Sequence, residues 1–305
     1  MAESNTYRTP MTPWPALEGT GKTVHLDEQD VDIFYFEAGS PTAPAIVMVH
    51  GLGDEADTWR YAIPPLAEDH RVIALDLPGF GRSGHPKRAY TPEFHQTAIL
   101  DLMDQLGIDR AILMGSSLGA ILTHSIAVDH PDRVSGLVLA DGALYQPIQM
   151  DDKGLQLMAI PLLGELIYTF YRLNPDSAYD SLRPVYHDLD SLPKVDRDFL
   201  YRRVNKRVWS NGQRRAYFST LRKLIPWVKE RQENLPAKLQ TLLTSTLVVR
   251  GEFDTLFSAE NAEAIQEAQP KAAVLTIDGV GHLPQQEAPD AFNAGLRAWL
   301  NRVNL

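Results

Sequence analysis

The sequence predicts an α/β fold, in which a mostly parallel, doubly wound central sheet carries a helical insertion. Short apolar stretches without alternation, such as Ala45–His50 and Ala111–Met114, are typical of strands that are buried on both faces of a parallel sheet. Segments with helical periodicity, such as Thr97–Leu106 and Leu118–His130, lie between them. This alternation stops over residues 145–236, where no strand is predicted.

The order of the elements divides the chain into three parts. We expect residues 1–23 to be an N-terminal extension on the surface, residues 24–144 and 237–305 to form the core, and residues 145–236 to form a helical lid. The closing helix is predicted over Asp290–Val303. The predicted strands are Val31–Glu37, Ala45–His50, Arg71–Asp76, Ala111–Met114, Val134–Ala140, Thr246–Arg250 and Ala272–Ile277.

Composition narrows the class of protein. The 305 residues are 44% hydrophobic, which is enough for a sizeable core. The net charge of −10 argues against nucleic acid and against anionic lipid as partners. The absence of cysteine excludes disulfides and thiolate chemistry. Residues 1–21 lack the pattern of a signal peptide, and no apolar run approaches the ~18 residues of a membrane span. We therefore expect a cytoplasmic protein without a membrane partner, either as a monomer or as a homodimer.

A candidate nucleophile lies between the strand Ala111–Met114 and the helix after it. Residues Gly115–Gly119 read Gly-Ser-Ser-Leu-Gly, which is the G-x-S-x-G pattern of a sharp turn from strand to helix. Such a turn holds the central serine, Ser117, in a strained conformation at the amino end of a helix, where the helix dipole favours developing negative charge. Ser116 is one residue short of the apex, and we expect it to be structural.

A serine hydroxyl needs a base, and the base needs an orienting carboxylate. His282 follows a late strand in a glycine-containing loop, and Asp254 follows the strand Thr246–Arg250. The order serine, aspartate, histidine suits this architecture. Asp141, at the end of the strand Val134–Ala140, is the rival acid, and Glu252 is expected to point away or to close the turn.

Several motifs occur together in a fixed order, and with them the chain resembles the α/β-hydrolase family over residues 24–145 and 236–305. One small departure is Ser245, where relatives often have proline. The matching segments are His50–Gly53 with Trp59 behind it, Asp76–Gly84 (D-x-P-G-x-G-x-S), Gly115–Gly119, Gly251–Asp254, and Gly281–His282 followed by Glu287 and Pro289.

The resemblance implies further site residues. The backbone N–H groups of Leu52 and Leu118 would form the oxyanion hole, and His50 would brace its loop. Gly51, Gly53 and Trp59 would lie near the substrate, and Leu163 and Tyr168 of the lid would line the pocket, although we expect most apolar lid residues to pack lid helices against each other. Asp54 with Glu55 is expected to be a solvated loop, and Tyr201–Trp209 a solvated helix face.

These features favour acyl transfer from an ester of a small or medium, fairly apolar substrate, without a metal or an organic cofactor. Two alternatives stay open, namely a C–C bond hydrolase of β-diketone-like ring-cleavage products and a ligand-binding receptor on the same fold. Halide and epoxide chemistry usually need aspartate at the turn in this family, so Ser117 argues against both.

Overall fold

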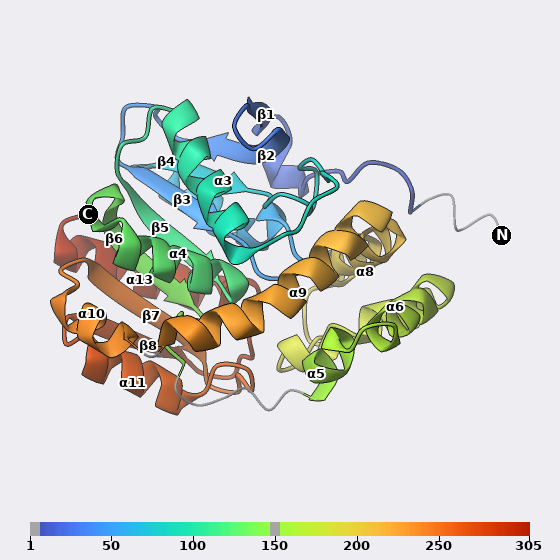
Figure 1. Cartoon of the computed structure of the whole chain (residues 1–305). Coiled ribbons are helices and arrows are strands. Elements are labelled where there is room, and N and C mark those ends of the chain that lie inside the picture. The colour runs from blue at the N-terminus through green and yellow to red at the C-terminus, as the bar shows by residue number, and fades with distance from the viewer. Residues whose placement is uncertain (1–6, 147–152, 233) are drawn as a thin grey trace.

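In the computed structural model, the strands form one eight-stranded sheet with the order β1-β2-β4-β3-β5-β6-β7-β8 (Figure 1). The structure describes residues 7–146, 153–232 and 234–305. The pairs β1·β2 and β2·β4 are antiparallel and the remaining pairs are parallel, as the sequence predicts for the centre of the sheet. The strands are β1 (Gly21–Leu26), β2 (Val31–Ala38), β3 (Ala45–Val49), β4 (Arg71–Leu75), β5 (Ala111–Ser116), β6 (Val134–Ala140), β7 (Ser245–Gly251) and β8 (Ala272–Ile277).

Two boundaries differ from the prediction. Strand β1 was not expected, because only Leu26 of its six residues is buried and its two apolar residues, Val24 and Leu26, are too few to show a clear alternation. The helix expected from Thr97 begins at Pro92, because Thr91 caps it by accepting a hydrogen bond from the Phe94 N–H at 3.2 Å.

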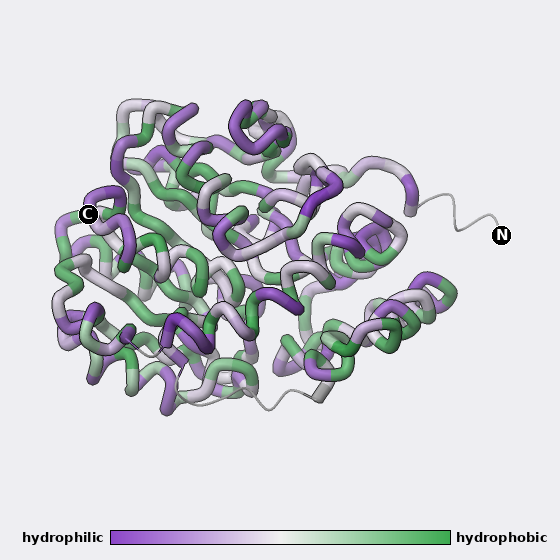
Figure 2. Tube along the Cα trace, in the orientation of Figure 1, coloured by the Kyte–Doolittle hydropathy of each residue, from purple (hydrophilic) through white to green (hydrophobic). Residues whose placement is uncertain are grey.

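Helices cover both faces of the sheet, and hydrophobic residues concentrate along the central strands (Figure 2). One apolar cluster joins the sheet to α3 (Pro92–Gln105), α4 (Leu118–Asp129) and α11 (Ala259–Ala268). A second cluster joins the opposite face to the 3₁₀ helix η2 (Ala56–Trp59), to α2 (Ile63–Leu66) and to α13 (Pro289–Val303). Because β3 to β8 are parallel, their carboxyl ends lie at the same edge of the sheet. In such sheets, ligands bind at this edge.

Between β6 and β7, the described residues form helices joined by loops and contain no strand, which confirms the predicted helical insertion. No helix among the described residues is long and apolar enough to span a membrane. The helices between β6 and β7 are α5 (Lys153–Ala159), α6 (Leu163–Leu173), α7 (Pro175–Asp180), the 3₁₀ helix η4 (Arg183–Val185), α8 (Lys194–Trp209), α9 (Asn211–Gln232) and α10 (Leu235–Thr241). Two further short helices, α12 (Pro284–Glu287) and the 3₁₀ helix η3 (Pro131–Arg133), belong to the core.

The N-terminal segment is anchored, contrary to the expectation of a surface extension. Trp14 and Leu17, the latter in the 3₁₀ helix η1 (Pro15–Leu17), are buried in the second apolar cluster. The Trp14 N–H donates to Asp57 Oδ1 at 2.7 Å, and the Arg60 guanidinium lies 5.1 Å from the centre of the Trp14 ring. Part of the stretch 1–23 thus belongs to the core.

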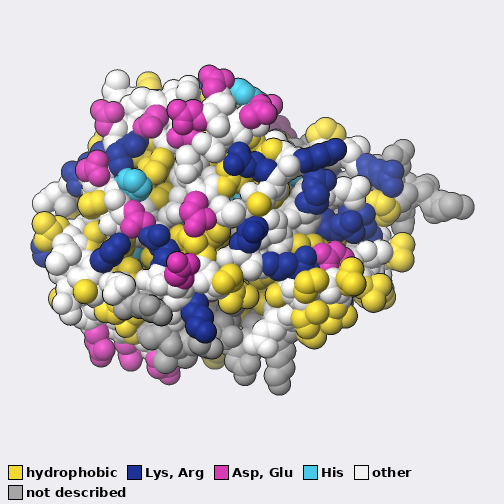
Figure 3. All heavy atoms as spheres, in the orientation of Figure 1, with side chains coloured by type: hydrophobic (Ala, Val, Ile, Leu, Met, Phe, Trp, Pro, Cys, Tyr) yellow, Lys and Arg dark blue, Asp and Glu magenta, His cyan; other side chains and the backbone are white. Residues whose placement is uncertain are grey.

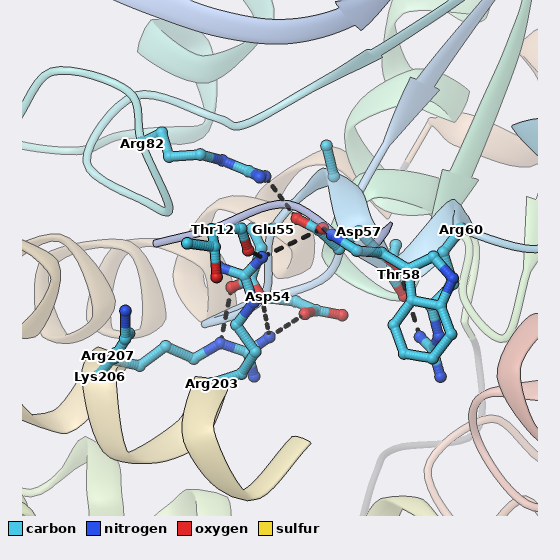
Figure 4. A network of polar contacts seen from close by, with 12 residues as sticks. Thr12, Asp54, Glu55, Asp57, Thr58, Arg60, Arg82, Arg203, Lys206 and Arg207 are labelled. Carbon is cyan, nitrogen blue, oxygen red and sulfur yellow. Dashed lines mark hydrogen bonds and ion pairs between the residues drawn. The ribbon is translucent and has the colours of Figure 1, made fainter. Parts of the chain in front are cut away.

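A buried network of ion pairs replaces the solvated loop and the solvated helix face expected from the sequence (Figure 4). Glu55 and Asp57 are each 1% exposed. Arg207 of α8 binds Glu55 with Nε–Oε2 and Nη2–Oε1 distances of 2.7 Å, and also pairs with Asp54. Arg203, one helical turn earlier, lies 3.1 Å from Asp57 and 3.5 Å from Glu55. The prediction failed because each charge alone resembles an ordinary surface residue.

The core contributes its own cation to this network. Arg82 binds Asp76 at 2.7 Å and Asp57 at 2.6 Å. Burial by itself would raise the pKa of Glu55, but Arg207 and Arg203 outweigh it and hold that pKa at about 2. Glu55 is therefore ionised at neutral pH, and Arg207 and Arg203 compensate its charge. Burial raises the pKa of Asp57, against the opposing effect of Arg203 and Arg82.

Breaking this network should strongly destabilise the protein. Arg203→Ala would leave Asp57 and Glu55 short of a positive charge in the interior, and we expect the free energy of unfolding to fall by about 3–5 kcal/mol. The half-exposed Arg183, which pairs with Asp180 and Asp190, is the control, and Arg183→Ala should change stability far less because solvent screens these pairs. Urea denaturation of the two variants tests this, and equal losses would contradict it.

Candidate active site

Strand β5 ends in a sharp turn that presents Ser117. The backbone of Ser117 has φ 52° and ψ −115°, a strained combination for a residue with a side chain, and its N–H donates to Ala140 O at 2.9 Å. Helix α4 begins at the next residue, Leu118, whose N–H is among those that have no acceptor within the helix. The turn thus has the conformation that the sequence pattern predicts.

The glycines of the motif are required by close packing. A Cβ on Gly115 would lie 2.3 Å from the carbonyl carbon of Gly119, and a Cβ on Gly119 would lie 2.2 Å from Val49 O. These neighbours are backbone atoms and have little freedom to move. The turn can therefore fit between β3 and α4 only with glycine at both positions.

His282 and Asp254 form a buried hydrogen-bonded pair. His282 Nδ1 lies 2.9 Å from Asp254 Oδ2, and Asp254 Oδ1 accepts from the N–H groups of Leu256 and Phe257 at 2.8 and 3.1 Å. Burial alone would raise the pKa of Asp254, but His282 and then these amides outweigh it and lower the pKa. Asp254 is therefore a carboxylate, and it orients the imidazole with Nδ1 protonated. Nε2 of His282 is buried and has no hydrogen-bond partner among the described residues.

Other acidic residues hold the histidine loop in place. Glu287 Oε1 accepts from the Gly281 N–H at 2.9 Å, and Glu252 Oε2 accepts from the Gly279 N–H at 2.9 Å, so Glu252 closes the turn between β7 and the loop. The N–H of His282 itself donates to Val185 O of the lid at 3.0 Å. The loop is thus fixed by core and lid together.

Asp141 lies beside this pair but does not replace Asp254. It is 1% exposed, and its Oδ1 accepts from the Gly251 N–H at 3.0 Å. Burial, and then the charge of Asp254, raise the pKa of Asp141 well above its usual range. The structure therefore joins the charged Asp254, and not Asp141, to His282. One ligand atom from each of Asp141, Asp254 and His282 lies within 4.8 Å of the others, which is close enough for a metal ion, although His282 and Asp254 are also hydrogen-bonded to each other.

The loop after β3 passes next to the serine. A Cβ on Gly51 would lie 3.3 Å from Ser117 Cβ. Both ring nitrogens of His50 are occupied, because Nδ1 lies 2.7 Å from Gly51 O and Nε2 lies 2.9 Å from the Leu77 N–H. A carbonyl only accepts and an N–H only donates, so His50 is the Nδ1–H tautomer. It braces the loop, as the sequence analysis expects.

The remaining predicted residues are dispersed. Trp59 is fully buried and packs against Phe292, with ring centroids 6.3 Å apart, so it lies in the second core cluster. Tyr168 packs within the lid against Phe218 and donates to Arg207 O at 3.2 Å. Leu163, at the start of α6, is partly exposed. Gly53 stays at the loop and has φ 77°.

Two groups of residues near the site were missed by the sequence analysis. Tyr217 of α9 lies over Gly53, since a Cβ there would be 3.2 Å from its ring. Buried amides after His282 reach the turn. Gln285 Nε2 lies 3.2 Å from Ser116 Oγ and 3.3 Å from Thr58 Oγ1, and Gln286 binds both Thr58 and Arg60. These contacts join residues far apart in the chain, and no local pattern announces them. They do not test a catalytic role. The contact between Gln285 and Ser116 Oγ agrees with the structural role that we expect for Ser116.

Comparison with known proteins identifies the fold. The sequence profile of the alpha/beta hydrolase fold matches residues 44–289. Epoxide hydrolase 3 of Xenopus tropicalis is 24% identical, over 91% of this chain and 77% of that protein. The structure is similar to the 2-hydroxy-6-oxo-6-phenylhexa-2,4-dienoate hydrolase of Rhodococcus sp. strain RHA1, with a TM-score of 0.76, 24% identity and coverage of 92% and 98%. A putative lipase of Acinetobacter baumannii has a TM-score of 0.77, 20% identity and coverage of 99% and 94%.

The packing of the turn makes a prediction that is independent of any reaction. Gly119→Ala places a methyl group against the backbone of Val49, and we expect it to destabilise the protein by about 3 kcal/mol. Gly295→Ala on α13 is the control, because the new methyl group meets the flexible end of Leu275, and alanine favours the helix by about 1 kcal/mol. Thermal unfolding compares the two. A Gly119→Ala protein as stable as Gly295→Ala would refute the account of the turn.

Proposed function

Because the chain belongs to the family with the alpha/beta hydrolase fold, we propose that it is a serine hydrolase that cleaves carboxylic esters. One observation carries this proposal. The turn that strains Ser117 is linked to the histidine segment, because Gln285 Nε2 lies 3.2 Å from Ser116 Oγ. Nδ1 of His282 is held by a buried carboxylate, 2.9 Å away, and its Nε2 has no partner among the described residues. This is the arrangement needed to activate a hydroxyl.

In the proposed reaction, Ser117 Oγ attacks the ester carbonyl carbon, while His282 Nε2 takes the hydroxyl proton. Asp254 stabilises the imidazolium that results. His282 then protonates the departing alcohol, which leaves an acyl group on Ser117. A water molecule, deprotonated by the same nitrogen, releases the acid and restores the serine.

The oxyanion of each tetrahedral intermediate would be bound by backbone N–H groups of Leu118 and Leu52. Leu118 begins α4, so the helix dipole also favours the charge. Gly51 lies beside Ser117, and Gly53 lies under Tyr217, which supports a substrate path between this loop and the lid. We propose that Leu163 and Tyr168 shape the substrate pocket from the lid. Tyr168 would do so by packing against Tyr217, since the centroids of the two tyrosine rings are 6.0 Å apart.

Ester cleavage is tested by removing the hydroxyl group of Ser117. Wild-type protein should hydrolyse p-nitrophenyl esters and react with a fluorophosphonate probe, and Ser117→Ala should lose on the order of 10⁶ in kcat because its nucleophile is gone. Ser116→Ala is the neighbouring control and should retain labelling. A wild type that neither cleaves any ester nor becomes labelled rules out the esterase. Turnover of a β-diketone-like ring-cleavage product in its place would favour the C–C hydrolase, and ligand binding without turnover of either substrate would favour the receptor.

Replacing Asp254 should lower kcat much more than replacing Asp141, the other buried aspartate at the site. Asp254→Asn removes the charge that holds the protonated imidazole, and we expect about 10⁴-fold lower kcat. Asp141→Asn replaces a carboxyl group that is not the hydrogen-bond partner of His282 and whose pKa is raised by burial, so kcat should fall far less. Steady-state kinetics at neutral pH measure both. If the Asp141 variant were inactive and the Asp254 variant active, the assignment of the acid would be reversed.

A further inference from the structure

One segment of the lid exposes an unusual set of apolar side chains, which we call the lid ridge. It consists of Leu157 and Ile160 near the end of α5 and of Leu162, Leu166, Phe170 and Leu173 on and before α6. The exposed fractions reach 83% for Leu162, 78% for Leu173 and 67% for Leu166. The other exposed large hydrophobic residues of the described chain are scattered. A contiguous ridge of this kind marks a surface that meets another apolar phase.

Helix α6 carries apolar side chains on its solvent-facing side as well as on its buried side. Its inner face, with Gly164 and Tyr168, packs on Phe218 of α9. Its outer face faces solvent and borders a groove of about 370 Å³, lined by Leu166, Ile167, Thr169, Phe170 and Leu173. In Figure 3 the hydrophobic side chains gather over this helix, at the lower right of the molecule. The inner contacts already hold the helix, so the outer side chains are not needed for folding.

Positive charge accompanies the ridge although the whole chain is acidic. Several cations of α8 and α9 are neutralised by carboxylates, but Arg214 and Arg215 of α9 form no ion pair among the described residues; the neutralised ones include Arg203, Arg207, Arg222 and Arg231. The guanidinium groups of Arg8 and Arg172 lie 4.9 and 5.9 Å from the centre of the Trp209 ring, and burial, Arg214 and Arg8 lower the pKa of Arg172. These cations thus lie close enough to repel one another.

A second group of cations consists of Lys87 and Arg88, on the loop before α3, and of Arg215 on α9. The exposed side chains of Lys87, Arg88 and Arg215 line a groove of about 290 Å³. Figure 3 shows a band of Lys and Arg above the hydrophobic patch. Acidic side chains gather at the upper and lower left of the same view, so the net charge of −10 does not describe this side of the molecule.

We propose that the lid ridge docks on the surface of a bilayer that contains anionic phospholipid. The leucines and Phe170 would enter the acyl boundary, while the neighbouring arginines and lysines would meet the headgroups. A second copy of the chain fits less well, because a two-fold contact through this face would bring the same cations together. The proposal goes beyond ester hydrolysis and does not depend on it. It departs from the expectation based on net charge.

Vesicle sedimentation tests the proposal with Ser117→Ala protein, which keeps the ridge and cannot degrade the lipid by the proposed route. The protein should bind phosphatidylcholine vesicles that contain one third phosphatidylglycerol, and bind pure phosphatidylcholine vesicles less. Adding Leu166→Ser or Phe170→Ser should weaken binding at least about tenfold. Leu243→Ser is the matched control, since Leu243 is 77% exposed and lies outside the ridge. Arg215→Gln should weaken binding more than Lys229→Gln, and added salt should weaken it further.

Three results would overturn the docking proposal. These are no binding to either vesicle, equal effects of the Leu166 and Leu243 changes, and a wild type that is a dimer without vesicles and becomes a monomer with Leu166→Ser. The last would identify the ridge as a self-interface. Turnover of a short soluble ester by Leu166→Ser in an otherwise wild-type chain is measured separately, so failure of docking and failure of the esterase proposal are told apart.

Discussion

The buried ion pairs between α8 and the segment after β3 are the constraint on which the rest of the site depends. Glu55 and Asp57 follow directly on the loop His50–Gly53, which passes beside Ser117. Their partners, Arg203 and Arg207, come from the lid. A charge cannot remain in the interior without its partner. The lid helix, the loop and the N-terminal segment that also binds Asp57 are therefore held as one unit.

A second polar chain ties the same unit to the histidine. Asp196 of α8 binds Arg60 at 2.5 Å, and Arg60 donates to Gln286 at 2.9 Å. Gln286 lies four residues after His282. The lid is thus attached to both sides of the candidate active site through α8. By contrast, the described residues of α5 and α6 contain no buried ion pair. These helices are held by apolar contacts, by the partly exposed pair of Arg222 with Glu165, and by hydrogen bonds from Tyr168 and Arg172 to the backbone of α8. Because displacing α8 would strip buried charges of their partners, we infer that substrate enters on the side of α5 and α6.

The sequence predicted the parallel sheet, the helical insertion and the turn at Ser117, because each leaves a local pattern. Strand ends also bring Asp254 and His282 to one edge, so topology was sufficient to propose them. The choice between Asp141 and Asp254 needed geometry, since both follow neighbouring strands. The ion network could not be foreseen, because Glu55 and Arg207 are far apart in the chain and both resemble surface charges. The burial of Trp59 in the second core cluster could not be foreseen for a related reason, since its position after the loop does not fix which way it points.

The net charge of the chain likewise does not predict how charge is distributed over its surface. A net value of −10 averages over acids and bases that the fold separates, and screening confines each exposed charge to its neighbourhood within about 10 Å. A surface therefore responds to its local charge and not to the total. In this chain, the bases of α8 serve two purposes. Those that face the core, such as Arg203 and Arg207, compensate buried carboxylates. Another, Lys206, donates to Pro10 O at 2.6 Å and to Thr9 Oγ1 at 3.0 Å. The same helix that fixes the lid to the candidate active site thus also holds the N-terminal segment.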